Sequence, residues 1–191
     1  MKLDGLDITD KLWKYINDKI VILGHDFSDV DSIVSGVMLE YMLDVDGFDV
    51  SFCILDKEIP NETKEILSKY DFDASRYIKD INEIQADHYI LVDHHNRDLD
   101  KDIILIVDHH PTNIKINAEL IFNKNISSTA LYLLEENENY INIKNTKLIF
   151  LATMLDTASF NSTKSRDIDK EYIINECKKY GIDYNKLYKQ F

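Results

Sequence analysis

The sequence predicts an α/β fold in which helices cover both faces of a mostly parallel sheet, a three-layer, Rossmann-like arrangement. Short continuous apolar runs, typical of buried parallel strands, alternate with segments that have the length and periodicity of helices. Polar residues gather where the apolar runs end, which is the edge at which parallel sheets form their sites. The 191 residues are expected to make a single domain, 1–191.

Local patterns justify each element. The expected strands are the apolar runs at residues 19–25, 48–55, 87–95 and 103–110. The expected helices are the segments at residues 8–18, 32–44, 60–70, 127–137, 145–160 and 167–180. Pro60 stands where proline opens a helix, residues 127–129 supply capping side chains, and Gly181 suits a helix end. Strands that alternate with helices in this way favour a parallel sheet.

Composition narrows the classes of partner and compartment. Acidic residues outnumber basic ones by 35 to 22, and the formal net charge of −13 disfavours nucleic acid as a partner. No apolar run approaches the ~18 residues of a membrane span, and the charged N-terminal segment does not resemble a signal peptide. Cys53 and Cys177 are far apart and form no CxxC pattern. We therefore expect a cytoplasmic protein with no membrane partner.

Three of the expected strands end in clusters of histidine and aspartate. Five of the six histidines lie in these clusters, at residues 24–32, 93–96 and 108–111. Imidazole and carboxylate together are ligands for manganese, iron, cobalt or zinc, and a carboxylate can bridge two ions. Two ions about 3.5–4 Å apart can hold both an attacking hydroxide and a leaving phosphate oxygen. Asp156 is a further candidate, because an unpaired carboxylate near the end of an apolar helix is costly.

Each of these residues also has a structural interpretation. A single Asp or His at a strand end is usually a helix cap or a solvated loop residue, and this interpretation is favoured for Asp26, His88 and Asp98. Residues 127–129 are favoured as an N-cap over a phosphate-binding element. For the whole set metal binding is favoured, because three strand ends bring the same ligand chemistry to one edge.

The ordered motifs resemble those of the DHH superfamily of phosphoesterases, in particular the N-terminal catalytic domain of manganese-dependent family II inorganic pyrophosphatases and exopolyphosphatases. The four motifs are matched by His25, Asp29 and Asp31, by Asp93-His94, by Asp108-His109-His110 and by Asp156-Thr157. The resemblance covers nearly the whole chain and implies the DHH-domain fold. As an ordered set the motifs are specific, whereas a DHH tripeptide alone is weak.

The resemblance also implies roles for these residues. One divalent ion would be bound by His25 and Asp29, the other by Asp31, His109 and Asp156, with Asp93 bridging the two. His110 would contact a substrate phosphate and donate a proton to the leaving group, so that Asp93 and His110 are the implied catalytic residues. Asp108 would orient a histidine ring. The implied cofactors are two divalent ions, with Mn²⁺ preferred and Co²⁺ or Mg²⁺ as alternatives.

The implied reaction is hydrolysis of inorganic pyrophosphate or short polyphosphate by a hydroxide that bridges the two ions. Two alternatives stay open: a phosphodiesterase acting on short oligonucleotides or cyclic dinucleotides, and a catalytically weak metal-binding domain. The acidic balance disfavours the first, and the complete ligand set disfavours the second. The expected partner is a small phosphate-containing anion, and the resemblance suggests a homodimer.

The sequence departs from the family pattern in two places. Pyrophosphatases of this branch continue into a second domain whose basic side chains clamp the substrate, whereas residues 182–191 are expected to begin a connector. Lys164 and Arg166 are nominated as substrate-binding cations in its place, with surface positions before a helix as their alternative. The second motif reads Asp-His-His-Asn instead of Asp-His-Asn, which leaves His95 without an assigned role.

Overall fold

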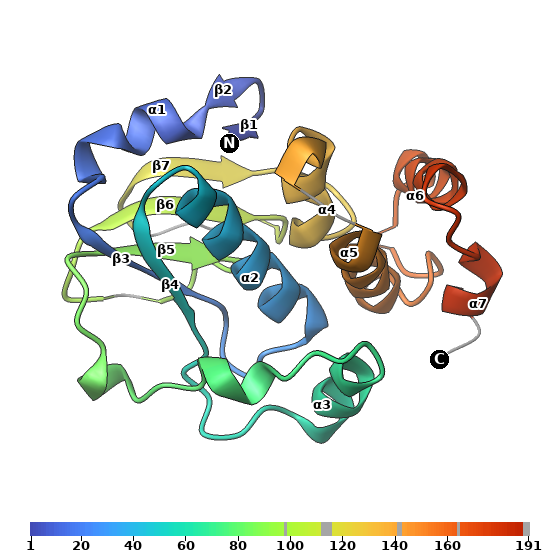
Figure 1. Ribbon diagram of the computed structural model, residues 1–191, viewed down its shortest axis with the longest axis horizontal. Coiled ribbons are helices and arrows are strands. Elements are labelled where there is room, and N and C mark those ends of the chain that lie inside the picture. Colours follow the sequence, from blue (N-terminus) through green and yellow to red (C-terminus); the bar gives the residue numbers. More distant parts are fainter. Residues whose placement is uncertain (98, 112–115, 141–142, 164, 189–191) are drawn as a thin grey trace.

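The computed structural model describes residues 1–97, 99–111, 116–140, 143–163 and 165–188 (Figure 1). At its centre is a five-stranded sheet with the strand order β4-β3-β5-β6-β7. The strands are β3 (Lys19–Leu23), β4 (Asp49–Cys53), β5 (His88–Val92), β6 (Ile103–Asp108) and β7 (Ala118–Asn123). Every neighbouring pair is parallel. The predicted α/β class with a parallel sheet is confirmed.

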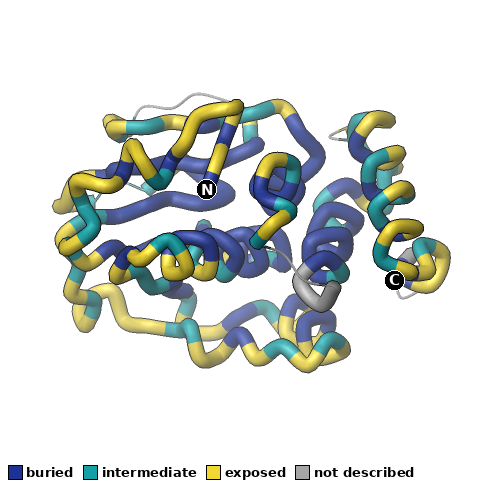
Figure 2. The backbone as a smooth tube through the Cα atoms, turned by 45° about the horizontal axis from the view of Figure 1, so that its top comes forward, coloured by how far each residue is buried: buried dark blue, intermediate teal, exposed yellow. Residues whose placement is uncertain are grey.

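Helices gather on one face of this sheet. The largest, α2 (Val30–Val45), packs against β3, β4 and β5 and contacts α4 (Thr129–Glu135) and α5 (Ile143–Asp156). α5 is buried along residues 148–154, while α6 (Asp167–Lys179) and α7 (Tyr184–Tyr188) lie on its outer side (Figures 1 and 2). The expected, largely buried helix is therefore present, but it ends at Asp156, and residues 157–160 form turns instead of continuing it.

The remaining elements lie at the periphery. β1 (Lys2–Leu3) and β2 (Leu6–Asp7) form a small antiparallel hairpin ahead of α1 (Ile8–Leu12). The other short elements are α3 (Asn61–Ser68) and the 3-10 turns Trp13–Tyr15, Ala74–Tyr77, Ile81–Glu83 and Glu138–Tyr140. In the described part of the chain, no helix has both the length and the apolar character that crossing a membrane requires.

The second face of the sheet differs from the expected helical layer. Val21, Leu91 and Ile106 belong to a smaller apolar cluster on this face, which packs against loop residues such as Leu55 and Leu99. The segments that join β5 to β6 and β6 to β7 are residues 93–102 and 109–117. Both are shorter than the dozen or more residues that a helical crossover takes. Among the described residues, the cover of this face is therefore made by loops and a 3-10 turn instead of α-helices.

The strand order sets the position of a site. From β3 the chain passes to β4 on one side and then returns to β5 on the other side, so β3 and β5 flank a topological switch point. Ligands of parallel α/β sheets bind at such points, outside the carboxyl ends of the strands. α2 can lie close to β4 because Gly36 has no side chain, since a Cβ there would stand 2.2 Å from a ring carbon of Phe52.

Candidate metal centre

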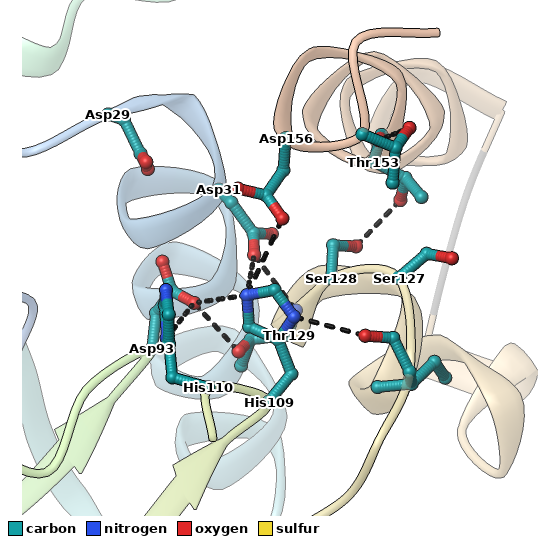
Figure 3. Close-up of polar contacts among 12 residues, drawn as sticks. Asp29, Asp31, Asp93, His109, His110, Ser127, Ser128, Thr129, Thr153 and Asp156 are labelled. Atoms are coloured by element: carbon teal, nitrogen blue, oxygen red, sulfur yellow. Dashed lines mark hydrogen bonds and ion pairs between the residues drawn. The ribbon is translucent and has the colours of Figure 1, made fainter. Parts of the chain in front are cut away.

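The candidate ligands come together at the carboxyl edge of the sheet, and Figure 3 shows most of them. They are supplied by the loop after β3, by the start of α2, by the ends of β5 and β6, and by the last residue of α5. The set consists of His25, Asp29, Asp31, Asp93, His109 and Asp156. Residues far apart in sequence thus form one compact polar cluster.

His109 faces three carboxylates. Its Nε2 lies 3.4 Å from Asp93 Oδ1, 3.6 Å from Asp156 Oδ2 and 3.8 Å from Asp31 Oδ2. Its Nδ1 lies 3.1 Å from the carbonyl oxygen of Ile126, so Nδ1 carries the proton and donates it to that oxygen. Nε2 is buried and has no hydrogen-bond partner. A buried lone pair that faces three acidic groups at these distances suits a bound cation.

A second group surrounds His25. Its Nε2 lies 3.4 Å from Asp29 Oδ1 and 3.5 Å from Asp93 Oδ2, while its Nδ1 lies 2.8 Å from the carbonyl oxygen of Asp26. One ligand atom from each of His25, Asp29 and Asp93 lies within 4.8 Å of the others. This is a second set of nitrogen and oxygen atoms with the spacing of a metal site.

Asp93 belongs to both groups. Its Oδ2 faces His25, whereas its Oδ1 faces His109. The hydroxyl of Thr129 donates to Oδ1 at 2.8 Å, which fixes the buried carboxylate. The backbone of Asp93 has a φ of 63°, in the left-handed region that few residues other than glycine adopt. One carboxylate oxygen is thus directed at each group, which is the arrangement of a bridging ligand.

The first turn of α4 holds Asp31. The backbone N–H of Thr129 donates to Asp31 Oδ2 at 2.8 Å, and that of Ala130 donates to Oδ1 at 3.0 Å. Ser128 is the N-cap of α4, as its side chain accepts a hydrogen bond from the backbone N–H of Leu131. The expected capping is confirmed, and the same turn also positions an acidic side chain of α2.

Burial makes the cluster electrostatically unfavourable without a cation. Burial and the charges of Asp29 and Asp156 raise the pKa of Asp31 to about 7, and burial together with Asp31 raises the pKa of Asp93 to about 8. Burial lowers the pKa of His25, but its hydrogen bonds to Asp29 and Asp93 outweigh this effect and raise that pKa to about 11. Divalent cations would replace protons at these atoms, so metal binding and proton release are coupled.

Asp108 lies in the layer beneath the candidate ligands. Its buried Oδ1 accepts hydrogen bonds from His110 Nδ1 at 2.8 Å and from the backbone N–H of His109 at 2.8 Å. Its Oδ2 accepts a short hydrogen bond from His95 Nδ1. Burial raises the pKa of Asp108, but the hydrogen bonds from His110 and His95 hold it well below its usual range. Asp108 therefore stays ionised and contacts two histidine rings.

His110 is the remaining residue nominated for the site. Its Nδ1 lies 3.9 Å from Asp93 Oδ1, and one of its ring nitrogens lies within 4.8 Å of ligand atoms of Asp93 and His109. Because Nδ1 donates to Asp108, it is less suited to bind a metal. The position next to the cluster is nevertheless suited to contact a molecule bound there.

The two nominated cations fall in different places. Lys164 lies outside the described residues. Arg166 donates from Nε to Asp169 Oδ2 at 2.8 Å, and its guanidinium lies 3.9 Å from Glu135 Oε1. Asp169 is buried and also accepts the backbone N–H of Ser127 at 2.9 Å, so this network ties α6 to the start of α4. These contacts favour a structural role for Arg166, and substrate binding by it stays a prediction.

A cavity of about 390 Å³ lies beside the cluster, lined by His25, Asp26, His94, Asn96 and Arg97. It adjoins the candidate centre because His25 contributes to both. Arg97 is the one arginine or lysine among the lining residues. It pairs with Asp26, whose side chain is 69% exposed. Ion pairs that involve an exposed carboxylate are weak, so little stability depends on this pairing.

Three contributors to the site were not anticipated from the sequence. Thr129 lies in a run of capping residues, which indicated a helix start but not which hydroxyl turns toward the cluster. His95 and Arg97 follow the second motif, and their partners Asp108 and Asp26 are distant in sequence. Only the pairing of β5 with β6 and with β3 brings these residues together.

Comparison with known proteins reveals a consistent likeness. The DHH family, N-terminal domain, matches residues 19–159, a range that includes every candidate ligand. The chain is 29% identical to the probable manganese-dependent inorganic pyrophosphatase of Lactobacillus delbrueckii subsp. bulgaricus, over 88% of this chain and 57% of that protein. The protein of the same name from Lactobacillus johnsonii gives the same identity and the same coverage.

Solved structures give the same fold. An exopolyphosphatase-related protein from Bacteroides fragilis superposes with a TM-score of 0.67 at 22% identity, covering 94% of this chain and 58% of that chain. Exonuclease RecJ bound to manganese superposes with a TM-score of 0.50 at 16% identity, over 91% of this chain and 47% of that one. The chain spans 57% of the length of the curated relatives that it matches.

Proposed function

The chain belongs to the DHH family, N-terminal domain, and on this premise we propose that it hydrolyses a phosphoanhydride with two divalent cations as cofactors. The proposed substrate is inorganic pyrophosphate or short polyphosphate, as the names of the similar proteins suggest. The observation that carries the proposal is the position of Asp93, with one oxygen toward His25 and the other toward His109. A shared carboxylate of this kind suits two ions at the short spacing that phosphoryl hydrolysis uses.

In this proposal each group of ligand atoms holds one cation. The first would be held by His25, Asp29 and Asp93, and the second by Asp31, Asp93, His109 and Asp156. When bound, the pair supplies positive charge to phosphoryl oxygens and lowers the pKa of a water molecule. The partnerless Nε2 of His109 supports this assignment. Manganese is proposed because the curated relatives are named as manganese-dependent, and the mixed nitrogen and oxygen donors suit it.

The other side chains would orient the substrate and move protons. His110 donates from Nδ1 to Asp108, so its contact with a phosphate oxygen would be through Nε2. With both ring nitrogens protonated, Nε2–H would donate its proton to the leaving phosphate, which departs with an extra negative charge, and the Nδ1–H tautomer would remain. Thr129 keeps the carboxylate of Asp93 in one orientation through its hydroxyl. Arg97 would add positive charge from the neighbouring cavity.

The test is release of phosphate from pyrophosphate by protein loaded with Mn²⁺, with tripolyphosphate and a dinucleotide in parallel. Asp93→Asn removes the shared negative charge with little change in shape and should lower kcat at least about 10³-fold. Asp44→Asn, an exposed substitution on α2, is the matched control and should leave turnover unchanged.

The substrates separate the competing functions. Turnover of pyrophosphate or tripolyphosphate that is lost only in Asp93→Asn would support the proposal. Cleavage of the dinucleotide alone would establish a phosphodiesterase instead. Binding of two ions without turnover of any of the three would exclude a self-sufficient hydrolase and favour the weak metal-binding alternative.

Two further proposals concern the cellular location and the oligomeric state of the protein. A cytoplasmic location fits its two free, buried cysteines, which a reducing compartment would preserve. A homodimer fits the open edge strand β7, where Ile121 is 44% exposed. Light scattering on a size-exclusion column would test the dimer, and a monomeric mass at micromolar concentration would exclude it.

A further inference from the structure

We infer that His95 is a positioning residue, which acts through the buried Asp108 to fix the tautomer and orientation of the His110 ring. The effect on turnover rests on the proposed function. The hydrogen-bond chain from His95 to His110 rests only on the geometry of the three side chains.

The donors to Asp108 divide unevenly between its two oxygens. Oδ1 accepts the ring N–H of His110 at 2.8 Å and the backbone N–H groups of His109 at 2.8 Å and His110 at 3.1 Å. Among the described residues, Oδ2 accepts a hydrogen bond from His95 Nδ1 alone. Since Asp108 is completely buried, loss of His95 would leave a carboxylate oxygen without a donor and without water.

The hydrogen-bond chain from His95 through Asp108 to His110 determines which ring nitrogens carry protons. An ionised carboxylate only accepts hydrogen bonds, so both rings that contact Asp108 must present Nδ1–H to it. In His110 this leaves Nε2 as the nitrogen through which any contact with a substrate oxygen is made. If Asp108 turned toward another donor, His110 would be able to adopt the opposite tautomer, and its donor and acceptor positions would be exchanged.

The loop that carries His95 is itself anchored on both sides. His94 is buried and its Nε2 lies 3.3 Å from the carbonyl oxygen of Leu23 at the end of β3. The backbone N–H of Asn96 donates to His94 Nδ1 at 3.3 Å. His95 is therefore held between fixed neighbours, and its ring links the end of β5 to the end of β6.

The experiment compares His95→Leu and His95→Asn with a control, His88→Gln, at a histidine on the opposite end of β5. Leucine removes the donor, whereas the amide nitrogen of asparagine is attached to Cγ, as Nδ1 is in histidine, and can donate to Oδ2. The first readout is the long-range ¹H–¹⁵N spectrum of the histidine rings in metal-free protein, which reports the tautomer of His110. The second is the division of the effect between kcat and KM for pyrophosphate.

In His95→Leu we expect His110 to lose its fixed Nδ1–H tautomer, and kcat to fall about tenfold or more while KM changes less than about threefold. His95→Asn should restore both the tautomer and most of kcat, and His88→Gln should resemble the unsubstituted protein. An unchanged His110 tautomer in folded His95→Leu would overturn the inference, as would failure of a folded His95→Asn to restore it.

Should His95→Leu not fold, His95→Gln takes its place, because its amide lies one bond further out and cannot reach Oδ2 in the same geometry. In His95→Gln, too, we expect His110 to lose its fixed Nδ1–H tautomer. Absence of pyrophosphate turnover in the unsubstituted protein would count against the proposed function, and the ring spectra would still decide the role of His95.

Discussion

At Asp93 the requirements of folding and of ligand binding oppose each other. The side chain is buried, its pKa is raised to about 8 by burial and by Asp31, and its backbone has a φ of 63°. A buried carboxylate is unfavourable without a cation, and the positive φ adds a cost in backbone conformation. Residues under such conflict mark functional sites more often than structural ones.

Asp93→Asn should therefore weaken Mn²⁺ binding at both groups, since a neutral amide does not bridge two cations. The affinity for the more weakly bound ion should fall at least about 100-fold. A titration in which electron paramagnetic resonance reports free Mn²⁺ would measure both affinities. Asp44→Asn serves as the control. Two ions bound to Asp93→Asn with unchanged affinity would show that Asp93 is not a shared ligand.

Arg97→Ala should raise KM for pyrophosphate about tenfold and leave Mn²⁺ affinity unchanged, because Arg97 contributes charge from the cavity wall and no ligand atom. Steady-state kinetics at fixed Mn²⁺ would test this. Arg76→Ala, which removes an exposed arginine outside the candidate centre, is the matched control. An unaltered KM in Arg97→Ala would exclude a contact with substrate.

At the scale of single residues, the sequence indicated which side chains gather at the candidate centre but not the hydrogen bonds that hold them there. All six candidate ligands converge, because short apolar strands bring their ends to one edge. The donors that hold them, such as Thr129 and His95, depend on the rotation of a helix and on strand register. A single sequence contains no signal for either.

Among the elements, four of the five strands of the main sheet were predictable from the sequence, and the edge strand β7 was not. β3 and β6 are apolar along most of their length because both of their faces are covered. β7 alternates partly buried and exposed residues over its first four positions and includes Glu119 and Asn123, so its apolar signal is weak. The loop cover of the second face leaves no mark in the apolar runs and follows from connections, residues 93–102 and 109–117, that are too short for a helical crossover.

Gly36→Ala tests the close approach of α2 to the sheet. A Cβ at this position would stand 2.2 Å from the buried ring of Phe52, so the helix or the ring must move. We expect a loss of about 1–3 kcal/mol in the free energy of unfolding, despite the higher helix propensity of alanine. Urea unfolding would measure it, with Asp44→Ala on the exposed side of α2 as the control. A gain in stability would mean that the ring has room to turn.

For the whole molecule, the cluster predicts opposite effects of pH on the metal-free and the metal-bound protein. The pKa values of Asp31 and Asp93 are raised to about 7 and about 8, and that of His25 to about 11. Groups whose pKa is higher in the folded state stabilise it at low pH, and this contribution is lost as pH rises through the folded value. The metal-free protein should therefore lose stability from Asp31 and Asp93 between about pH 4 and pH 8, and from His25 between about pH 6.5 and pH 11.

Bound Mn²⁺ requires the same groups without their protons, so the increase in Tm that it causes should grow over that range. At a fixed Mn²⁺ concentration, equal to 100 times the dissociation constant at pH 8.5, we expect an increase on the order of 5–10 °C at pH 8.5 and a much smaller one at pH 6. Thermal unfolding with and without Mn²⁺ at matched pH would measure the difference. An increase that is largest at pH 6 would contradict the assignment.

The candidate ligands extend from His25, just after β3, to Asp156, at the end of α5. During synthesis from the N-terminus, all ligands of the first group are present once Asp93 has been added. The second group remains incomplete until α5 has been made. At ordinary rates of translation this delay is on the order of several seconds. If the chain holds two cations as proposed, the second one finds its full set of ligands only after α5 has been made, so the ribosome sets the order in which the two sites become complete.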